Sequence, residues 1–186
     1  MCASVRARSK AWAFLSFEYV LGHGRSTERP DVPIVGMTMK PHFAAIVEDM
    51  KRKHGLRIKR WRRNMSGCAW RVYHADGRVV NWVESPYPKT PISLAIFLHE
   101  VGHHVIGFEK YRRRCEEEYH VWVWAIEQMK RLGVEPDARV WRRFDLSMQY
   151  AVDKAVRRGI KQLPAPLMRF VAEAAGTTTG DLSRAA

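Results

Sequence analysis

Two histidines and a glutamate stand at a fixed spacing in the middle of the chain, in the run His99-Glu100-Val101-Gly102-His103. Residues four apart lie on the same face of an α-helix, so His99 and His103 can bind one metal ion together. Glu100 then lies beside that ion, where a carboxylate can accept a proton from a water molecule. The pattern H-E-x-x-H on a helix is typical of zinc sites that hydrolyse peptide bonds.

The residues around the motif predict the helix that it needs. Thr90 is a favourable N-cap residue, and Pro91 fits the first helical position, where its missing N–H costs nothing. Gly107 can provide a left-handed C-terminal cap. Apolar residues and both motif histidines recur at spacings of three and four, which predicts one buried face: Ile92, Ala95, Ile96, His99, His103 and Ile106. Burial favours the neutral imidazoles that bind metals. Two ordinary core histidines are the alternative interpretation, but it gives the buried Glu100 no role.

A catalytic zinc ion normally has three protein ligands and one open position for water. We expect the third ligand on a helix from Cys115 to about Leu132, which begins with Glu116, Glu117 and Glu118. Helical geometry places Glu118 at the centre of the apolar face, Glu117 on its flank and Glu116 toward solvent. Favourable acidic charge near a helix N-terminus explains Glu116 and Glu117 but not Glu118. Because an unpaired buried carboxylate is costly, we predict Glu118 as the third ligand, with Glu117 as the alternative.

Together these two segments, LHEVGHHVIGF from Leu98 and EEEYHVWVWAIE from Glu116, resemble the metal-binding core of a known protein class. The class is the small gluzincin-type zinc metallopeptidases, of the minigluzincin and ImmA/IrrE-like kind. The resemblance extends over about Ile92 to Ile126. It implies one Zn²⁺ ion and a peptide or protein substrate. The chain departs from the pattern at Trp122, where related enzymes often carry Asn or Asp, so another residue must support the site here.

The resemblance also implies a mechanism, the hydrolysis of peptide bonds by a zinc-bound water with Glu100 as the general base. Glu100 would then pass the proton to the departing amine. A second donor is usually required for the oxyanion. Five side chains are candidates: Tyr73, His74, His104, Tyr111 and His120. His104 lies one turn beyond Glu100 and has a structural interpretation too, as the hydrogen-bond partner of a neighbour.

The order of the expected elements predicts an α+β fold. It consists of a small, mostly antiparallel three-stranded sheet packed on the motif helix and the glutamate helix, with extra helices at both ends. A helix that begins at Pro41 and ends at Gly55 precedes a strand at Leu56–Arg62. The apolar stripe of this helix is formed by Phe43, Ile46, Val47 and Met50. Further helices are expected from Pro136 toward Ile160 and after Pro164 and Pro166.

Asp76-Gly77 predicts a two-residue hairpin turn between strands at Cys68–Ala75 and Arg78–Glu84. A turn of this length pairs three sets of residues: Trp70 with Val83, Val72 with Asn81, and His74 with Val79. In enzymes of the kind resembled, an edge strand near the metal pairs with an extended substrate. We expect Arg78–Glu84 to be that edge strand, because exposed edges bind peptides through backbone hydrogen bonds.

Four parts are expected along the chain of 186 residues. Residues 1–39 form an N-terminal extension with a helix at Lys10–Leu21 and a linker. Residues 40–133 form the metallopeptidase core and residues 134–175 a C-terminal helical part. Residues 176–186 form a flexible tail.

The chain is strongly basic, with 32 Lys and Arg against 19 Asp and Glu and a net charge of +13. Eight of the thirteen residues in Lys51–Arg63 are basic, and Trp61 lies among them. Such a segment can follow a phosphate backbone and stack on bases. No zinc finger or aromatic RNA-binding pattern accompanies it. The alternative function is therefore a basic nucleic-acid-binding protein with a structural or vestigial zinc site.

The three cysteines, Cys2, Cys68 and Cys115, are widely separated and form no C-x-x-C pair. An odd number of cysteines without a pattern disfavours a disulfide framework and predicts that the protein is located in the reducing cytoplasm. The apolar run Ala11–Leu21 contains Glu18 and has no small-residue cleavage site, which disfavours export. No uninterrupted apolar stretch is long enough to span a membrane, so no membrane partner is expected.

Overall fold

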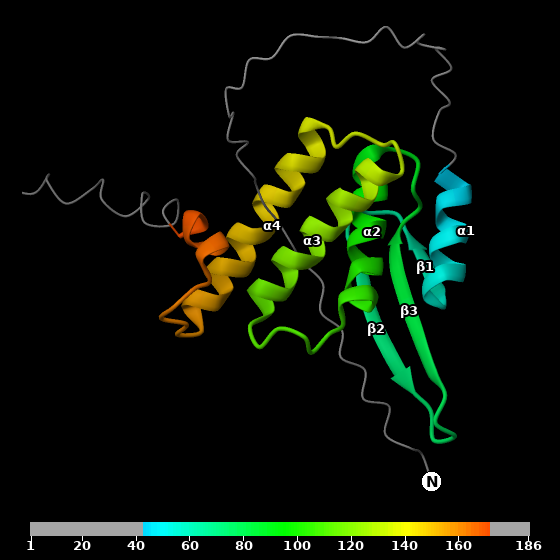
Figure 1. Cartoon of the computed structure of the whole chain (residues 1–186), viewed down its shortest axis with the longest axis horizontal. Coiled ribbons are helices and arrows are strands. Elements are labelled where there is room, and N and C mark those ends of the chain that lie inside the picture. Colours follow the sequence, from blue (N-terminus) through cyan, green and yellow to red (C-terminus); the bar gives the residue numbers. More distant parts are fainter. Residues whose placement is uncertain (1–42, 172–186) are drawn as a thin grey trace, which may run out of the picture.

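Residues 43–171 are described by the structure, a computed structural model, and they form an α+β fold with a three-stranded sheet. The predicted helix at Lys10–Leu21, the linker and the tail lie outside the described residues. In chain order the elements are α1 (Phe43–His54), β1 (Leu56–Arg62), β2 (Cys68–Tyr73), β3 (Val79–Pro86), α2 (Pro91–Ile106), α3 (Arg114–Arg131), α4 (Ala138–Arg157) and the 3₁₀ helix η1 (Ala165–Phe170). Figure 1 shows α2 between the sheet on one side and α3 on the other, with α4 beyond α3.

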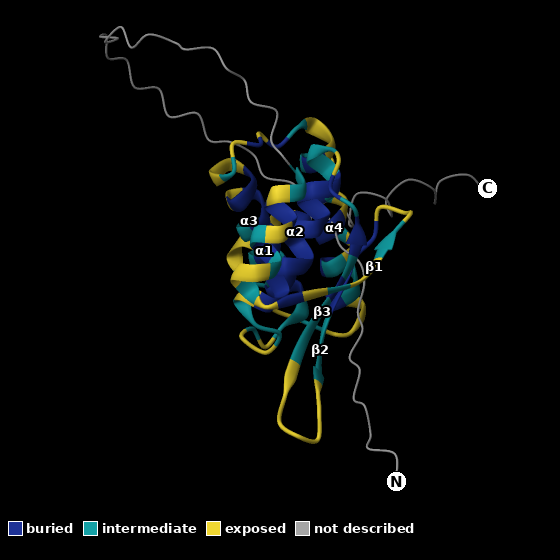
Figure 2. Cartoon of the chain, turned by 90° about the vertical axis from the view of Figure 1, so that its right-hand side faces the viewer, coloured by how far each residue is buried: buried dark blue, intermediate teal, exposed yellow. Residues whose placement is uncertain are grey.

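Helix α2 is the central element, and its sequence explains why. Thr90 is its N-cap and forms a reciprocal capping box with Ser93, and Pro91 occupies the first turn as predicted. Gly107 follows the last turn with a φ of 95°. Every residue from Ser93 to His104 is buried, so the helix is covered on all sides rather than on the one predicted face. A helix that is buried on all sides lies in the middle of a core, and Figure 2 shows α2 in that place.

The sheet is mixed, with the strand order β1-β3-β2. β2 pairs antiparallel with β3, whereas β1 pairs parallel with β3. The prediction of a mostly antiparallel sheet is therefore wrong. The expected edge strand at Arg78–Glu84 is wrong too, because β3 lies in the middle and the edges of this sheet are β1 and β2. Parallel pairing of β1 with β3 depends on contacts between distant residues, which hydrophobic alternation does not encode.

The turn between β2 and β3 lies at the predicted place but has a different form. The amide of Gly77 donates to the carbonyl of His74, and the amide of His74 donates to the carbonyl of Arg78. Gly77 has a φ of 82°, so the loop is a three-residue turn with a glycine bulge.

The extra loop residue shifts the pairing by one position. Trp70 lies opposite Trp82 instead of Val83, and Tyr73 lies opposite Val79. The predicted two-residue turn and its register are wrong. A shift of one residue exchanges the two faces of a strand. Val83 and its partner Ala69 consequently lie on the buried face.

Helix α3 packs along α2, and the two helices approach closely at Gly102. A Cβ atom at that position would lie 3.0 Å from Trp124 Cε3 and 3.1 Å from Val121 Cγ1. The motif glycine therefore permits the distance at which side chains from α3 can reach the motif histidines.

The Asp137 side chain caps α4 by accepting from the amides of Arg139 and Val140. Among the described residues, no helix is both long and apolar enough to cross a bilayer.

Candidate metal centre

Three side chains from two neighbouring helices converge in the interior: His99 and His103 from α2 and Glu118 from α3. Nε2 of His99 lies 3.2 Å from Nε2 of His103 and 3.2 Å from Oε2 of Glu118. The remaining distance, from Nε2 of His103 to Oε2 of Glu118, is 3.7 Å. All three residues are at most 5% exposed. The structure thus brings together the three residues that the sequence predicted as a ligand set.

The triangle of donor atoms has the dimensions that a metal site requires. A tetrahedral zinc ion with bonds of about 2.0 to 2.1 Å separates its ligand atoms by about 3.3 Å. Oε2 of Glu118 is buried and has no hydrogen-bond partner among the described residues. A buried carboxylate oxygen without a donor is costly, and a cation between the three atoms would satisfy it. The buried His-His-Glu group could therefore hold a metal ion.

Glu117 is buried as well, which differs from its predicted place on the flank of α3. Its Oε1 atom accepts a hydrogen bond from Nδ1 of His103 at 3.0 Å. A carboxylate bound to the far nitrogen of a histidine fixes the tautomer and orientation of the ring. Glu117 and Glu118 thus have different positions: Glu118 belongs to the triangle of donor atoms, and Glu117 lies behind His103.

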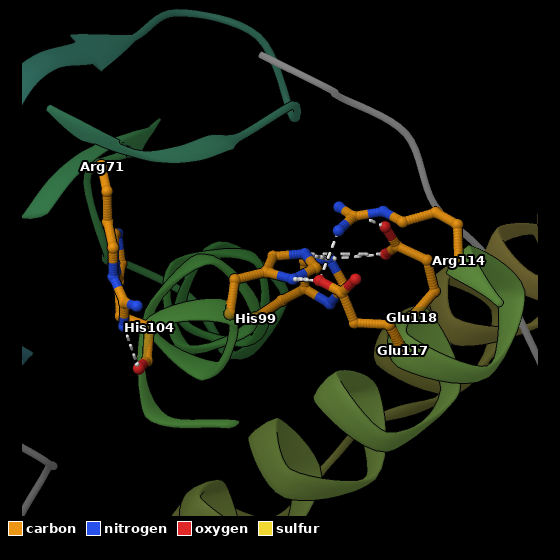
Figure 3. Close-up of polar contacts among 7 residues, drawn as sticks. Arg71, His99, His104, Arg114, Glu117 and Glu118 are labelled. Atoms are coloured by element: carbon orange, nitrogen blue, oxygen red, sulfur yellow. Dashed lines mark hydrogen bonds and ion pairs between the residues drawn. The ribbon is translucent and has the colours of Figure 1, made fainter. Parts of the chain in front are cut away.

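Arg114 connects the two glutamates from the first turn of α3. Its Nη1 atom donates to Oε1 of Glu117, and its Nη2 atom lies 2.7 Å from Oε1 of Glu118. Figure 3 shows the Arg114 guanidinium reaching toward both carboxylates, with Glu118 turned toward His99. The other oxygen of Glu118 is thereby left for the histidines. Arg114 and Glu117 thus support the group from α3, and the ring of Trp122 packs 4.5 Å from that of His99.

The electrostatics of the centre favour the forms that bind a metal. Burial lowers the pKa of His99 to about 4, against the opposing effect of its contact with Glu118. Burial alone would raise the pKa of Glu118, but His103, His99 and Arg114 outweigh it and lower that pKa to about 2. At neutral pH, His99 is therefore a neutral imidazole and Glu118 is a carboxylate.

Glu100 is buried beside this centre, but its surroundings shift its pKa in the direction opposite to that of Glu118. Burial raises its pKa well above the ordinary value, and the charge of Glu118 adds to the effect. The guanidinium groups of Arg114, Arg62 and Arg143 oppose it. A carboxyl group with a raised pKa is suited to accept a proton near neutral pH and to release it again.

Gly67, just before β2, makes the space that Glu100 occupies. A Cβ atom at Gly67 would lie 2.3 Å from Oε1 of Glu100, which is closer than atoms can approach. Only glycine leaves room for this carboxyl group in its present position. Met65, in the same loop, is by contrast 48% exposed. In the loop between β1 and β2, Gly67 therefore leaves the space in which the Glu100 carboxyl group lies.

The candidates for a second oxyanion donor differ in their surroundings. His104 lies 3.0 Å from the carbonyl of Trp82 through Nε2, and Arg71 donates to the backbone carbonyl of His104. Figure 3 places Arg71 and His104 on the side of His99 away from Arg114. His104 thus has the structural role that the sequence left open for it, as the hydrogen-bond partner of a neighbouring residue. His74 is exposed near the tip of the β2–β3 hairpin.

Tyr73 and Tyr111 line a cavity of about 750 Å³ that also reaches Glu117 and Arg114. The ring of Tyr111 is stacked on that of His120 at 4.3 Å. Tyr111 therefore combines a stacked ring with a place in the lining of the cavity that also contains Glu117 and Arg114. A second cavity of about 750 Å³ lies on the α4 side of α3 and reaches Glu118.

In the segment Lys51–Arg63, half of the basic residues lie close to acidic side chains. Lys51 pairs with Glu48 and Arg52 with Asp49, and both Arg60 and Arg62 pair with Glu84. The Trp61 ring packs against Tyr87 and Phe97 at the edge of the core. This ring is part of the packing instead of an exposed surface on which bases could stack. The contact of this segment with nucleic acid stays a prediction.

Sequence reasoning identified the triad but not the residues that support it. Arg114 could have been found, because it precedes Glu117 and Glu118 by three and four residues, the spacing at which helical side chains meet. Gly67 and the guanidiniums near Glu100 carry no such local signal, because they reach the site only through the tertiary structure.

Comparison with known proteins gives no match: no family model matches the chain, no curated protein matches it, and no solved structure matches it. The resemblance to gluzincins consequently rests on the motif segments alone.

Proposed function

We propose that this protein is a zinc-dependent metallopeptidase in which His99, His103 and Glu118 hold the metal and Glu100 is the general base. One observation carries the proposal: Glu100 is buried beside the triad, in space that Gly67 leaves open, but is not one of the three grouped donors. A structural zinc site normally has four protein ligands and no need for a buried proton acceptor. A hydrolytic site needs both a free coordination position and such an acceptor.

The side chains divide the chemistry between them. A zinc ion held by the triad would activate a water molecule and polarise a peptide carbonyl. Glu100 accepts the proton of the attacking water and then gives it to the amine as the C–N bond breaks, so that a carboxylic acid and an amine leave. Glu117 and Arg114 keep His103 and Glu118 in position throughout. Tyr111 is the proposed second donor to the oxyanion.

The edge of β2 is the proposed place for an extended substrate. β2 is an edge strand, and its residues line the cavity that also reaches Arg114 and Glu117. An edge strand offers unpaired backbone groups to a peptide. This strand takes the role that the sequence predicted for Arg78–Glu84.

The test is the variant Glu100→Gln, which keeps the size of the side chain but removes its basicity. We expect the purified variant to bind as much zinc as the wild-type protein, because Glu100 is not one of the three grouped donors. Peptide hydrolysis should fall by about two to four orders of magnitude. Zinc content is measured by mass spectrometry of the metal, and cleavage is measured by peptide-library proteomics.

Glu127→Gln is the matched control, since Glu127 lies on the exposed side of α3 and its carboxylate is 3.7 Å from Arg131. It should retain both zinc and activity. Equal hydrolysis by the wild-type protein and Glu100→Gln would remove Glu100 from the mechanism. A zinc-loaded wild-type protein that cleaves nothing in the library would instead favour a structural zinc site.

A further inference from the structure

The cavity between the start of α3 and the end of α4 has a strongly basic wall. It is lined by Arg112, Arg113 and Arg114 from the approach to α3, by Lys154 and Arg158 from α4, and by Lys161 from the segment that follows. The acidic residue in this lining is Glu118, the proposed metal ligand. The cavity therefore joins a concentration of positive charge to the metal centre.

Five of these six cations are not neutralised within the described part of the chain. Arg114 is paired with Glu117 and Glu118, but residues 43–171 provide no ion pair to Arg112, Arg113, Lys154, Arg158 or Lys161. Elsewhere on the described surface, exposed arginines such as Arg52, Arg78 and Arg139 lie against carboxylates. Like charges that line one hollow repel each other unless an anion enters it.

The sequence of α4 explains both the hollow and its charge. Ala151 and Ala155 lie one turn apart and line the cavity with side chains too small to fill it. Tyr150, Lys154 and Arg158 follow each other at the same spacing along the neighbouring stripe of the helix. The ammonium group of Lys154 lies 5.4 Å from the centre of the Tyr150 ring. Small residues and long cationic side chains from α4 thus line the same cavity.

We propose that this cavity binds acidic side chains of the polypeptide substrate, so that the enzyme cleaves preferentially beside an Asp- or Glu-rich segment. The inference rests on the proposed hydrolase function and adds the class of substrate. Because Glu118 belongs both to the triad and to the lining of this cavity, a polypeptide held at the triad can place side chains next to the scissile bond in this cavity. Carboxylates placed there would meet guanidinium and ammonium groups that can donate charge-assisted hydrogen bonds.

The shape of the charged region favours a peptide over a nucleic acid. Nucleic-acid binding requires cations spread along a groove that follows the phosphate backbone. Here the cations line one hollow, and the lining of that hollow includes a proposed metal ligand. Two or three carboxylates of a short peptide segment match this arrangement better than a continuous polyphosphate.

The experiment measures binding in the zinc-loaded Glu100→Gln variant, so that the peptide is not consumed. Three fluorescent probes of similar length are compared: a peptide with a run of Asp and Glu, the same peptide with Asn and Gln, and a single-stranded oligonucleotide. The double substitution Lys154→Ala and Arg158→Ala should weaken binding of the acidic peptide at least about tenfold at low salt.

The matched control is Lys53→Ala with Arg57→Ala, which removes the same charge from the basic segment outside the cavity. It should leave peptide affinity within about twofold of the parent. The substitution Ala151→Leu fills the hollow without a change of charge and should also weaken binding. Thermal melting of each variant shows whether it is folded, and Lys154 and Arg158 are not in the core.

The outcomes separate this inference from the proposed function. Binding of the acidic peptide that is lost in both cavity variants, and kept in the control, supports the inference even if no cleavage is found. Equal binding of the acidic and neutral peptides, no binding of either, or unchanged binding in folded cavity variants would overturn it. Stronger binding of the oligonucleotide, lost in the cavity variants, would overturn it in favour of a nucleic-acid site. Cleavage of neutral peptides by the wild-type protein would leave the hydrolase proposal intact in each of these cases.

Discussion

Oε1 of Glu117 lies 3.0 Å from Nδ1 of His103, while Nε2 of the same ring points to His99 and Glu118. The ring is thus held on one side by a carboxylate and presents its other nitrogen to the centre of the triad. Glu117 is itself held by Arg114, which also contacts Glu118. A single arginine therefore links the orientation of one proposed ligand to the position of another.

Removal of the Glu117 carboxylate should weaken metal binding without abolishing it. We expect Glu117→Ala to lower zinc affinity about 10- to 100-fold, because His103 loses the partner that orients its ring. Glu117→Gln should have a smaller effect, since its amide oxygen can still accept from Nδ1. Competition with a zinc-binding dye measures the affinities.

Glu118→Ala is the reference for this prediction, because it removes a proposed ligand and should reduce affinity more than either Glu117 variant. A larger loss in Glu117→Ala than in Glu118→Ala would exchange the roles of the two glutamates and contradict the assignment made from the structure.

Gly67 offers a way to displace the proposed base without replacing it. The methyl group in Gly67→Ala would overlap with Oε1 of Glu100, so the carboxyl group has to move. We expect zinc content to stay at the wild-type level and peptide hydrolysis to fall at least about 100-fold, as in Glu100→Gln. Metal analysis and a peptide-cleavage assay on the same preparation test both parts.

Met65→Ala, in the same loop, controls for a general disturbance of the connection between β1 and β2, and it should remain active. If Gly67→Ala hydrolyses peptides as fast as the wild-type protein, the position of Glu100 in this structure is not the one used in the reaction.

The triad was predictable because it depends on local geometry. Spacing of four residues places His99 and His103 on one face of a helix, and the apolar pattern of the next helix turns Glu118 inward. The role of Glu117 was not predictable in the same way. Its burial depends on where the His103 ring lies across the gap between α2 and α3, and no pattern within α3 contains that information.

The sheet shows the same division between local and distant effects. Leu56–Arg62 and the turn near Gly77 were predicted from alternation and turn residues, and both are present. The parallel pairing of β1 with β3 and the register of Trp70 with Trp82 were not. One additional loop residue changes every pair in the hairpin, and the choice of partner for β1 is made by the packing of the whole core.

Acid should destabilise the metal-free protein through His104. Burial lowers the pKa of this imidazole to about 4, although its contact with the carbonyl of Trp82 opposes the shift. In the unfolded chain, histidine has a pKa near 6.5 and takes up a proton at higher pH than in the folded state. The stabilisation from neutral His104 is therefore complete above about pH 6.5 and is lost as the pH falls toward 4. Its contribution between pH 7 and 4.5 is about 2 kcal/mol.

The test is His104→Gln, whose side-chain amide can still donate to the carbonyl of Trp82. Between pH 7 and 4.5, its free energy of unfolding should fall by about 2 kcal/mol less than that of the wild-type protein. Urea unfolding with EDTA present measures this difference. His74→Gln, an exposed change on the hairpin, should follow the wild-type pH dependence, and an equal loss in all three proteins would show that His104 is not buried in its neutral form.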